Sequence, residues 1–262
     1  MKFAAKAGIR SPLRYPGGKS RGIKHLVPMI EKVGAREVIA PFFGGGSIEI
    51  ACAKRGIRVW GYDGFKPVVV FWQALLKRRE ALVEAVESLY PLQDKKTFKA
   101  LQKQLREGID DPTNEAAAYF VVNRCSFNGT TLSGGFSKQA AEGRFTKSSI
   151  DRLRKFECPN LTVRWADFTG SLRVHPKEKF VYADPPYMIN SQNLYGTQGD
   201  MHKDFDHVAL YELLCERPSW MLSYNNCEEV RELYKGYKFY YPDWKYGMSE
   251  DKNSKEILIV SQ

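Results

Sequence analysis

One continuous stretch, residues 36–63, constrains the fold more than any other part of the sequence. It begins with a short apolar segment that is typical of a buried strand and runs into the glycine turn FGGGS (43–47). Residues 48–56 then have a helical pattern that ends at a glycine, a common C-terminal signal. A second apolar strand, 58–63, ends in Asp63. This strand–turn–helix–strand order is the building block of a parallel sheet, so the sequence predicts an α/β protein.

The rest of the chain adds strands and a long helical interruption. Helices are predicted at 21–33, 66–107, 113–122, 206–215 and 227–235, and strands at 161–168, 179–187, 220–225, 237–242 and 255–262. The Gly/Ser/Thr-rich segment 123–145 predicts a hairpin or a long loop. We therefore expect a doubly wound, mostly parallel sheet formed by residues 1–65 and 151–262, interrupted by a mainly helical insertion at 66–150.

Charge and composition indicate the kind of partner. The formal charge is +10 and the pI is about 9.3, which favours a polyanion such as nucleic acid, although a merely basic soluble protein has the same charge. The five cysteines form no CxxC pair and the four histidines are scattered, so we expect a reduced intracellular protein without a metal site. Without a signal-peptide core or an apolar run near the ~18–20 residues of a membrane span, we expect it to be soluble and cytoplasmic.

The segment DPPY (184–187) follows an apolar strand, and in open α/β sheets ligands bind at the carboxyl ends of strands. Pro185 and Pro186 remove two N–H donors, which leaves the Asp184 carboxylate and nearby carbonyls as acceptors. Tyr187 adds an aromatic face. This arrangement suits a planar group with an NH2, because hydrogen bonds to both N–H groups activate a weakly nucleophilic amine and align it with an electrophile. A rigid turn without a ligand is the alternative.

The glycine turn is the second candidate site. Gly44 and Gly46 would let the backbone approach a ligand, and the helix that follows favours a negative group. The nicotinamide fingerprint G-x-G-x-x-G fails because position 49 is Glu. Asp63 can accept two hydrogen bonds from ribose hydroxyls, as acids at this position do in nucleotide-binding sheets. A tight turn and a solvent-facing acid are the alternatives.

Two further segments are weaker candidates. YPGGKS (15–20) is similar to a phosphate loop, but a Walker A motif needs glycine where Leu13 stands, which argues against a nucleoside triphosphate site. Lys19 would instead suit a carboxylate, for example that of a methionine moiety. In WADF, Asp167 can accept from an adenine amine while Phe168 packs on the ring. A solvated lysine and a surface turn are the alternatives.

Four pieces stand in a fixed order: YPGGKS, PFFGGGS with Asp63, NRCSFNG, and DPPY. In this order the sequence resembles the Dam-type, D12 class of adenine-N6 DNA methyltransferases, with the motif order of the α group. The resemblance runs from Leu13 to Val260. It implies a Rossmann-like methyltransferase fold, and methyl transfer from S-adenosylmethionine to the N6 amine of adenine in a specific short sequence of double-stranded DNA.

The resemblance also implies roles for residues and segments. Those matching the catalytic motif are Asp184, Pro185, Pro186 and Tyr187. Those matching the cofactor motifs are Tyr15, Lys19, Phe43, Gly44, Gly46, Asp63, Asp167, Phe168 and again Asp184. The expected DNA contacts are Arg124, Asn128, Gly129 and Lys138. Residues 66–150 become a target-recognition domain with a hairpin, and residues 1–65 and 151–262 become the S-adenosylmethionine-binding catalytic domain.

The resemblance implies that the target adenine is flipped out of the duplex into the DPPY cup, without a metal. The partner is double-stranded DNA, a restriction endonuclease acting on the same site is compatible with the family, and we expect a monomer or weak dimer. Two departures concern DNA recognition: Phe65 stands where the family often has Asn, and TTLSGGFSKQ replaces an aromatic and basic segment. Further basic candidates are Lys77, Arg78, Arg79, Lys95, Lys96, Lys99, Arg144 and Lys147.

Several alternatives remain open. Other planar NH2 groups would suit a similar cup: N4 of cytosine in DNA, adenine in RNA, or a glutamine amide in a protein. The positive charge and the predicted hairpin argue against the glutamine amide. A catalytically inactive DNA-binding relative is an alternative of another class.

Overall fold

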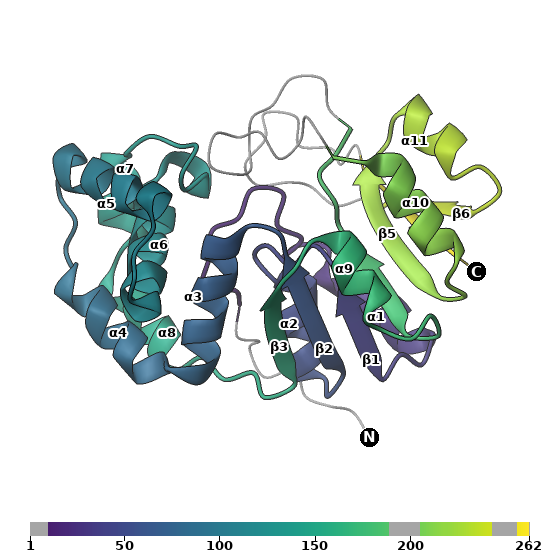
Figure 1. The fold of residues 1–262 in the computed structure, drawn as a ribbon, viewed down its shortest axis with the longest axis horizontal. Coiled ribbons are helices and arrows are strands. Elements are labelled where there is room, and N and C mark those ends of the chain that lie inside the picture. Colours follow the sequence, from purple (N-terminus) through teal and green to yellow (C-terminus); the bar gives the residue numbers. More distant parts are fainter. Residues whose placement is uncertain (1–9, 189–204, 243–255, 262) are drawn as a thin grey trace.

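A seven-stranded sheet forms the centre of the molecule in the computed structural model, which describes residues 10–188, 205–242 and 256–261 (Figure 1). Its strands are β1 (Glu37–Ala40), β2 (Arg58–Asp63), β3 (Leu161–Trp165), β4 (Phe180–Ala183), β5 (Trp220–Asn225), β6 (Lys238–Tyr240) and β7 (Glu256–Val260). The order across the sheet is β3-β2-β1-β4-β5-β7-β6, and among these seven strands β7 alone runs in the opposite direction to the others. The predicted mostly parallel, doubly wound sheet is confirmed.

Helices cover both faces of this sheet. They are α1 (Ile23–Lys32), α2 (Ser47–Lys54), α3 (Lys66–Lys77), α4 (Arg79–Ser88), α5 (Lys95–Glu107), α6 (Pro112–Cys125), α7 (Lys138–Arg144), α8 (Lys147–Arg154), α9 (Phe168–Arg173), α10 (His207–Cys215) and α11 (Glu228–Leu233), with a 3₁₀ turn η1 (Phe127–Gly129). Neighbouring strand residues point to opposite faces: Val38 packs in the core with α1 to α3, and Ile39 in the core with α9 to α11. Two covered faces explain why the central strand β4 (FVYA) is apolar and buried throughout.

The position of the ligand site follows from the strand order. Strands β1 and β4 are neighbours in the middle of the sheet, with Val38 beside Phe180. After β1 the chain moves to β2 on one side, and after β4 it moves to β5 on the other. The connections therefore leave a crevice at the carboxyl ends of β1 and β4, the usual ligand position in such sheets. FGGGS follows β1 and DPPY follows β4, so both motifs border this crevice.

Helices α4 to α8 lie together beyond the β3 edge, with α3 between them and the sheet (Figure 1). On one side of α3, Gln73 donates from Nε2 to the Val163 carbonyl of β3 at 3.1 Å. On the other, the Phe71 ring stacks on Phe120 of α6 with centroids 5.8 Å apart. One continuous apolar core joins this helical group to the sheet. The helices of the segment 66–150 thus extend the core of the sheet.

The segment 123–145, predicted as a hairpin or a long loop, does not form two paired strands. Asn128 and Gly129 have φ of 50° and 74°, the left-handed pair that an Asn-Gly hairpin turn needs. Within this segment, all of which the structure describes, the one antiparallel bridge joins Ser126 and Phe136. Pairing stops there because Ser137 caps a helix: its hydroxyl accepts from the Ala140 N–H at 3.2 Å, and α7 begins.

Besides α7, two more short helices, α8 and α9, occupy segments for which the sequence predicted none. Thr146 and Ser149 form a capping box that starts α8. Asp167 caps α9 by accepting from the Gly170 N–H at 2.6 Å, which ends the predicted strand 161–168 at Trp165. The predicted strand 255–262 is observed as β7, and its first and last residues lie outside the described part of the chain.

The glycine at position 61 provides a test of how tightly the turn is packed. A Cβ on Gly61 of β2 would lie 2.3 Å from the Phe43 ring, whereas a Cβ on Gly143 of α7 would meet no atom within 4 Å. We predict that Gly61→Ala lowers the free energy of unfolding by about 1–3 kcal/mol, since the buried ring has to move. Gly143→Ala should leave it unchanged or raise it by up to about 1 kcal/mol. Urea unfolding of both variants checks this, and equal effects would show that Phe43 is loosely packed.

Candidate active site

The two motifs meet in one cavity of about 260 Å³. All the residues predicted from the sequence as catalytic or cofactor-binding line it: Tyr15, Lys19, Phe43, Gly44, Gly46, Asp63, Asp167, Phe168, Asp184, Pro185, Pro186 and Tyr187. In particular, Asp63 at the end of β2 and Asp184 after β4 open into the same space. Acids 121 positions apart in the sequence can therefore contact a single ligand.

At the glycine turn, backbone atoms without side chains form part of the cavity wall. Gly44 and Gly46 are left-handed, with φ of 45° and 65°. A Cβ on Gly44 would lie 2.7 Å from the Tyr15 ring, and one on Gly46 would lie 2.6 Å from the Phe43 ring. Phe43 is buried and meets Trp72 edge-on, with centroids 5.2 Å apart. The Phe43 side chain therefore supports the turn from the core.

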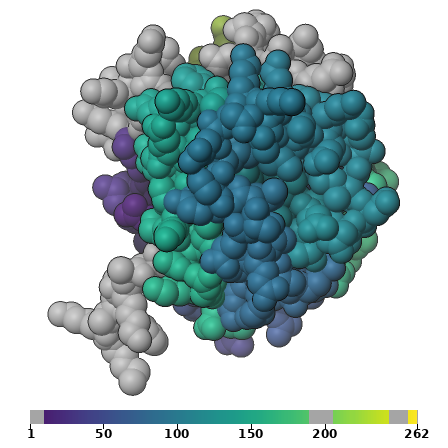
Figure 2. Space-filling view, turned by 90° about the vertical axis from the view of Figure 1, so that its left-hand side faces the viewer, coloured from purple at the N-terminus to yellow at the C-terminus, as the bar shows by residue number. Residues whose placement is uncertain are grey.

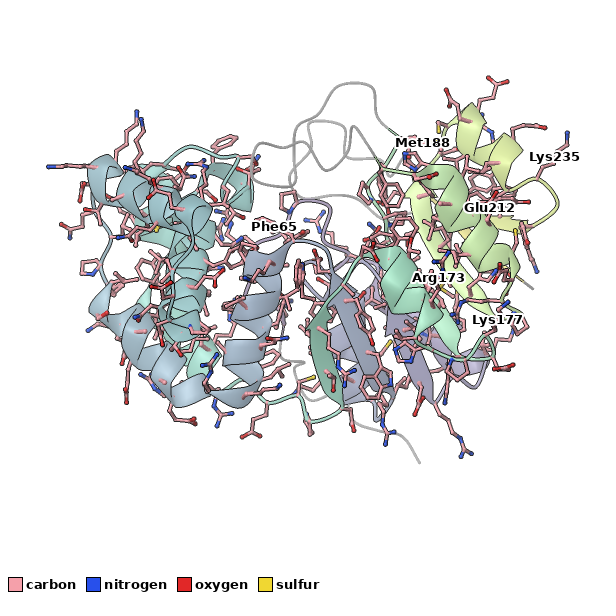
Figure 3. All side chains as sticks on the ribbon, in the orientation of Figure 1. Phe65, Arg173, Lys177, Met188, Glu212 and Lys235 are labelled. Carbon is pink, nitrogen blue, oxygen red and sulfur yellow. The ribbon has the colours of Figure 1, made fainter. Side chains whose placement is uncertain are left out.

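Asp63 is a buried acid that accepts hydrogen bonds from the backbone of this turn and of Phe65. Its Oδ2 accepts from the Gly44 N–H at 2.7 Å, and its Oδ1 accepts from the Phe65 N–H at 2.8 Å. Burial raises the pKa of Asp63 to about 6. Each oxygen has a second lone pair, so the carboxylate can also accept from hydroxyl groups in the cavity. The Phe65 ring lies near Tyr119, with centroids 6.2 Å apart, where the sheet and the helical group meet (Figure 3).

Three phenylalanines form an aromatic wall of the cavity: Phe42, Phe168 and Phe205. Their ring centroids lie 5.8 Å (42 to 168), 5.5 Å (42 to 205) and 5.1 Å (168 to 205) apart. Such a wall suits a flat heterocycle such as a purine. The sequence pointed to Phe168 alone, although the doubled Phe before GGGS was a usable signal for Phe42. Asp167 lines the same cavity, but its side chain also caps α9.

The DPPY cup contains a buried ion pair. The Lys19 Nζ, on a side chain only 3% exposed, donates to Asp184 Oδ1 at 2.7 Å and to Oδ2 at 2.8 Å. It also donates to the Tyr187 hydroxyl at 2.8 Å. Burial raises the pKa of Asp184, the Lys19 ammonium opposes that rise, and neighbouring Glu256 adds to it. The sequence suggested that Lys19 binds a carboxylate of a ligand, whereas here its ammonium pairs with a carboxylate of the protein.

The chain that follows the cup is fixed to strand β5. The Tyr187 ring stacks on Tyr224 of β5, with centroids 5.9 Å apart. The Met188 N–H donates to Asn225 Oδ1 at 3.1 Å, and Asn225 Nδ2 donates back to the Met188 carbonyl at 3.0 Å. Figure 3 labels Met188 at the end of the sheet where β5 stops. The cup is therefore tied to the end of the neighbouring strand.

Two buried acids of the site were missed in the sequence. Glu256 is 6% exposed, lies 3.2 Å from the Lys19 Nζ, and accepts a hydrogen bond from the Tyr187 hydroxyl. Glu49 of α2 lines the cavity, and burial raises its pKa to about 8. A charged residue inside an apolar helix (SIEIACAK) and one at the start of an apolar strand (EILIV) were the available signals.

A family model described as D12 class N6 adenine-specific DNA methyltransferase matches residues 15–248. The chain belongs to this family. No curated protein matches the sequence. Membership makes the chain an adenine-specific DNA methyltransferase, and enzymes of this kind generally take the methyl group from S-adenosylmethionine.

Among its described residues, this D12 class enzyme has no group of three His, Cys, Asp or Glu side chains that could hold a metal, and no helix with the length and hydropathy of a membrane span.

The D12 class enzyme holds Arg124, a predicted DNA contact, inside the protein. Its side chain donates from Nε and Nη2 to the Arg144 carbonyl at 2.8 and 2.6 Å, and from Nη1 to the Pro12 carbonyl at 3.3 Å. The residue is 7% exposed. These contacts link α6 to α7 and to the N-terminal segment. The placement argues against a direct contact to a base and gives Arg124 a supporting role.

The other predicted DNA contacts lie outside the cavity. Gly129 is buried, and a Cβ there would lie 2.6 Å from the Arg14 carbonyl, so it lets the loop pack closely. Asn128 is half-buried, and Lys138 is exposed, with its Nζ 3.9 Å from Glu142. Phe127, which the sequence did not single out, is 64% exposed on the same loop.

The role of Arg124 can be tested through stability. We predict that Arg124→Met lowers the free energy of unfolding by about 1–3 kcal/mol or more, because buried carbonyls lose their donors. Lys138→Met, at an exposed position, should change it by less than about 0.5 kcal/mol. Urea unfolding measures both. An Arg124→Met protein of unchanged stability that no longer binds DNA would contradict the supporting role and favour a direct contact.

Proposed function

We propose that this D12 class enzyme transfers the methyl group of S-adenosylmethionine to the N6 amine of an adenine that it flips out of a specific short sequence in double-stranded DNA. One observation carries the proposal: Asp63 and Asp184 open into one cavity together with the glycine turn and DPPY. S-adenosylmethionine supplies a methyl group on a positively charged sulfur. The protein has to bind that donor, hold the amine beside it and exclude water.

The residues of the cavity fit the donor. Asp63 offers acceptors for ribose hydroxyls, and its oxygens are already oriented by the N–H groups of Gly44 and Phe65. The aromatic wall of Phe42, Phe168 and Phe205 suits the adenine ring. The left-handed glycines keep side chains away from the ligand. Asp184 and Glu256 place negative charge in the cup, which favours a cation.

The DPPY cup can hold the amine of a base. Both Asp184 oxygens already accept N–H bonds from the Lys19 ammonium, so the cup is built to receive nitrogen donors. We propose that Asp184 and the Pro185 carbonyl accept from the N6 amine while the Tyr187 ring lies against the base. The N6 lone pair would form the bond to the methyl carbon while the carbon–sulfur bond breaks and its electron pair stays on sulfur. One N6 proton would leave by way of the Asp184 carboxylate that accepts its hydrogen bond. Alignment and this charged acceptor supply the rate enhancement.

The target adenine has to leave the helix to reach this cup. Tyr187 is half-buried and Pro185 is buried, at the bottom of a cavity that a stacked base in a duplex cannot enter. Extrusion of a base costs a few kcal/mol. Stacking on Tyr187 and hydrogen bonds to Asp184 would offset that cost.

We propose that segment 66–150 forms the DNA target-recognition region and that 1–65 and 151–262 form the catalytic region. A group of arginines supports this. Arg14, Arg144 and Arg152 lie close enough to Arg124 to lower its pKa, and burial is the larger cause. No ion pair to an acid is formed by these four within the described residues. Phosphate oxygens of DNA would supply the missing counter-charge.

This arginine group lies beside the loop and next to the cavity. Arg14 donates from Nη1 to the Ser126 carbonyl at 3.2 Å, immediately before the exposed ring of Phe127. It also directly precedes Tyr15, which lines the cavity. In Figure 2 the purple residues near the N-terminus lie beside green residues of the helical side. Phosphates held here would bring a neighbouring base close to the entrance of the cup.

The proposed reaction has a direct test. Wild-type protein incubated with duplex DNA and S-adenosylmethionine should produce N6-methyladenine, detected by mass spectrometry of the digested nucleosides. Asp184→Ala should abolish transfer, because the amine loses its charged acceptor, while its circular dichroism stays native. N4-methylcytosine in place of N6-methyladenine would contradict the assignment of the base. Near-normal turnover by Asp184→Ala would contradict the role of the carboxylate.

The arginine group is tested by the salt dependence of DNA binding. We predict that Arg144→Gln weakens binding of duplex DNA and reduces the slope of log K against log salt concentration by about 1, the effect of one lost phosphate contact. The matched control is Arg173→Gln, an exposed arginine on α9, labelled in Figure 3. Fluorescence anisotropy at several salt concentrations measures both. Identical slopes for the two variants would contradict the proposed contact.

A further inference from the structure

Glu256 completes the buried charge cluster of the cup from the other end of the chain. It is the first residue of β7 and pairs in register with Asn225 at the end of β5. Its carboxylate lies 3.2 Å from the Lys19 Nζ and accepts from the Tyr187 hydroxyl. It lies 72 positions beyond Asp184, outside the DPPY motif. Because it contacts both Lys19 and Tyr187, we ask which function its carboxylate has in the cup.

Two carboxylates lie against the single ammonium of this cluster. Asp184 Oδ1 is 2.7 Å and a Glu256 carboxylate oxygen is 3.2 Å from the Lys19 Nζ. A carboxylate attracts a cation, and the attraction is stronger in a partly buried site than in water. The second acid beside the cup therefore favours a sulfonium over a neutral thioether.

Lys19 has neutral acceptors in the Gly17 carbonyl, at 3.2 Å, and the Tyr187 hydroxyl, at 2.8 Å, but the reaction also requires a second charged acceptor for it. Its ammonium takes both oxygens of Asp184, at 2.7 and 2.8 Å. An incoming amine needs at least one of them. Because Lys19 is 3% exposed, it cannot turn to water when it gives up that oxygen. Glu256 is the charged acceptor already within reach.

We propose that Glu256 is a positioning residue: it holds the Lys19 ammonium and the Tyr187 hydroxyl while Asp184 exchanges Lys19 for the target amine, and it supplies the negative charge that selects a cationic cofactor. This inference rests on the proposed function of the cup. It predicts that the charge of Glu256, and not only its shape, matters. Glu256→Gln keeps the shape and an acceptor oxygen but removes the charge of one of the two carboxylates beside the Lys19 ammonium.

The test compares two ligands that differ in the charge on sulfur. Calorimetry on the full chain gives the dissociation constants of S-adenosylmethionine, a sulfonium, and of S-adenosylhomocysteine, a neutral thioether. We expect Glu256→Gln to weaken binding of the sulfonium on the order of tenfold more than binding of the thioether. We also expect kcat at saturating DNA to fall by on the order of tenfold or more. A structural role alone would weaken both ligands by the same factor; that result, or no change, would overturn the inference.

Two further variants keep the test decisive. Glu232→Gln removes an exposed acid on α11 and should leave the ratio of the two dissociation constants unchanged. Glu256→Asp keeps the charge but shortens the side chain, so it should preserve that ratio while lowering kcat. If thermal melting shows that Glu256→Gln does not fold, Glu256→Asp becomes the test variant. A ratio of the two dissociation constants that shifts about tenfold in Glu256→Asp would then overturn the inference. Failure of the proposed function itself looks different: wild-type protein would bind neither ligand or methylate no adenine.

Discussion

One buried ammonium holds together three distant parts of the chain. Lys19 comes from the loop before α1, Asp184 from the end of β4, and Glu256 from the start of β7, and the two carboxylates contact the Lys19 Nζ. Charged groups with so little exposure are stable only when they satisfy one another. The sheet order makes this possible, because β1 and β4 diverge at their carboxyl ends and leave room between their loops. The position of the cup therefore depends on this cluster as much as on the rigid prolines.

Charge is divided between the outside and the inside of the molecule. The chain carries a formal charge of +10, and arginines that pair with no acid in the described part of the chain gather near the N-terminal segment and the 126–129 loop. The cavity, by contrast, is lined by the buried acid Asp63 and the half-buried Asp184, and buried Glu256 lies behind Lys19 and Tyr187. A positive surface attracts a polyanion, and an acidic cavity favours a cationic cofactor. One protein can thus bring together two substrates of opposite charge without competition between their sites.

The parts of the site that local sequence chemistry determines could be predicted. A strand that runs into glycines or into Pro-Pro places those residues at the end of the sheet whatever surrounds them, so FGGGS, Asp63 and DPPY could be located in advance. The contacts between residues far apart in the sequence could not be predicted. These contacts join segments 69 to 165 positions apart in the sequence that pack together in the fold. They are the ion pair of Lys19 with Asp184, the hydrogen bond of Glu256 with Tyr187 and the contact of Arg124 with Pro12.

The errors in the helical segment have a related cause. The Asn-Gly pair does form a left-handed turn, as its sequence requires, but Ser137 then begins a helix where a second strand was expected. Local propensity predicted the turn, while the choice between strand and helix depended on a cap and on Ala140 and Ala141, which are buried against neighbouring elements. The same limit applies to Asp167, whose cap on α9 was not visible as such in the sequence.

The central claim is that a single cavity binds the methyl donor between Asp63 and Asp184. A crystal structure of the protein with S-adenosylhomocysteine tests it most directly. The account predicts ribose hydroxyls within hydrogen-bond distance of the Asp63 carboxylate, an adenine ring against Phe168, and the sulfur facing the DPPY cup. A ligand bound elsewhere, or one whose sulfur points away from Asp184, would contradict it.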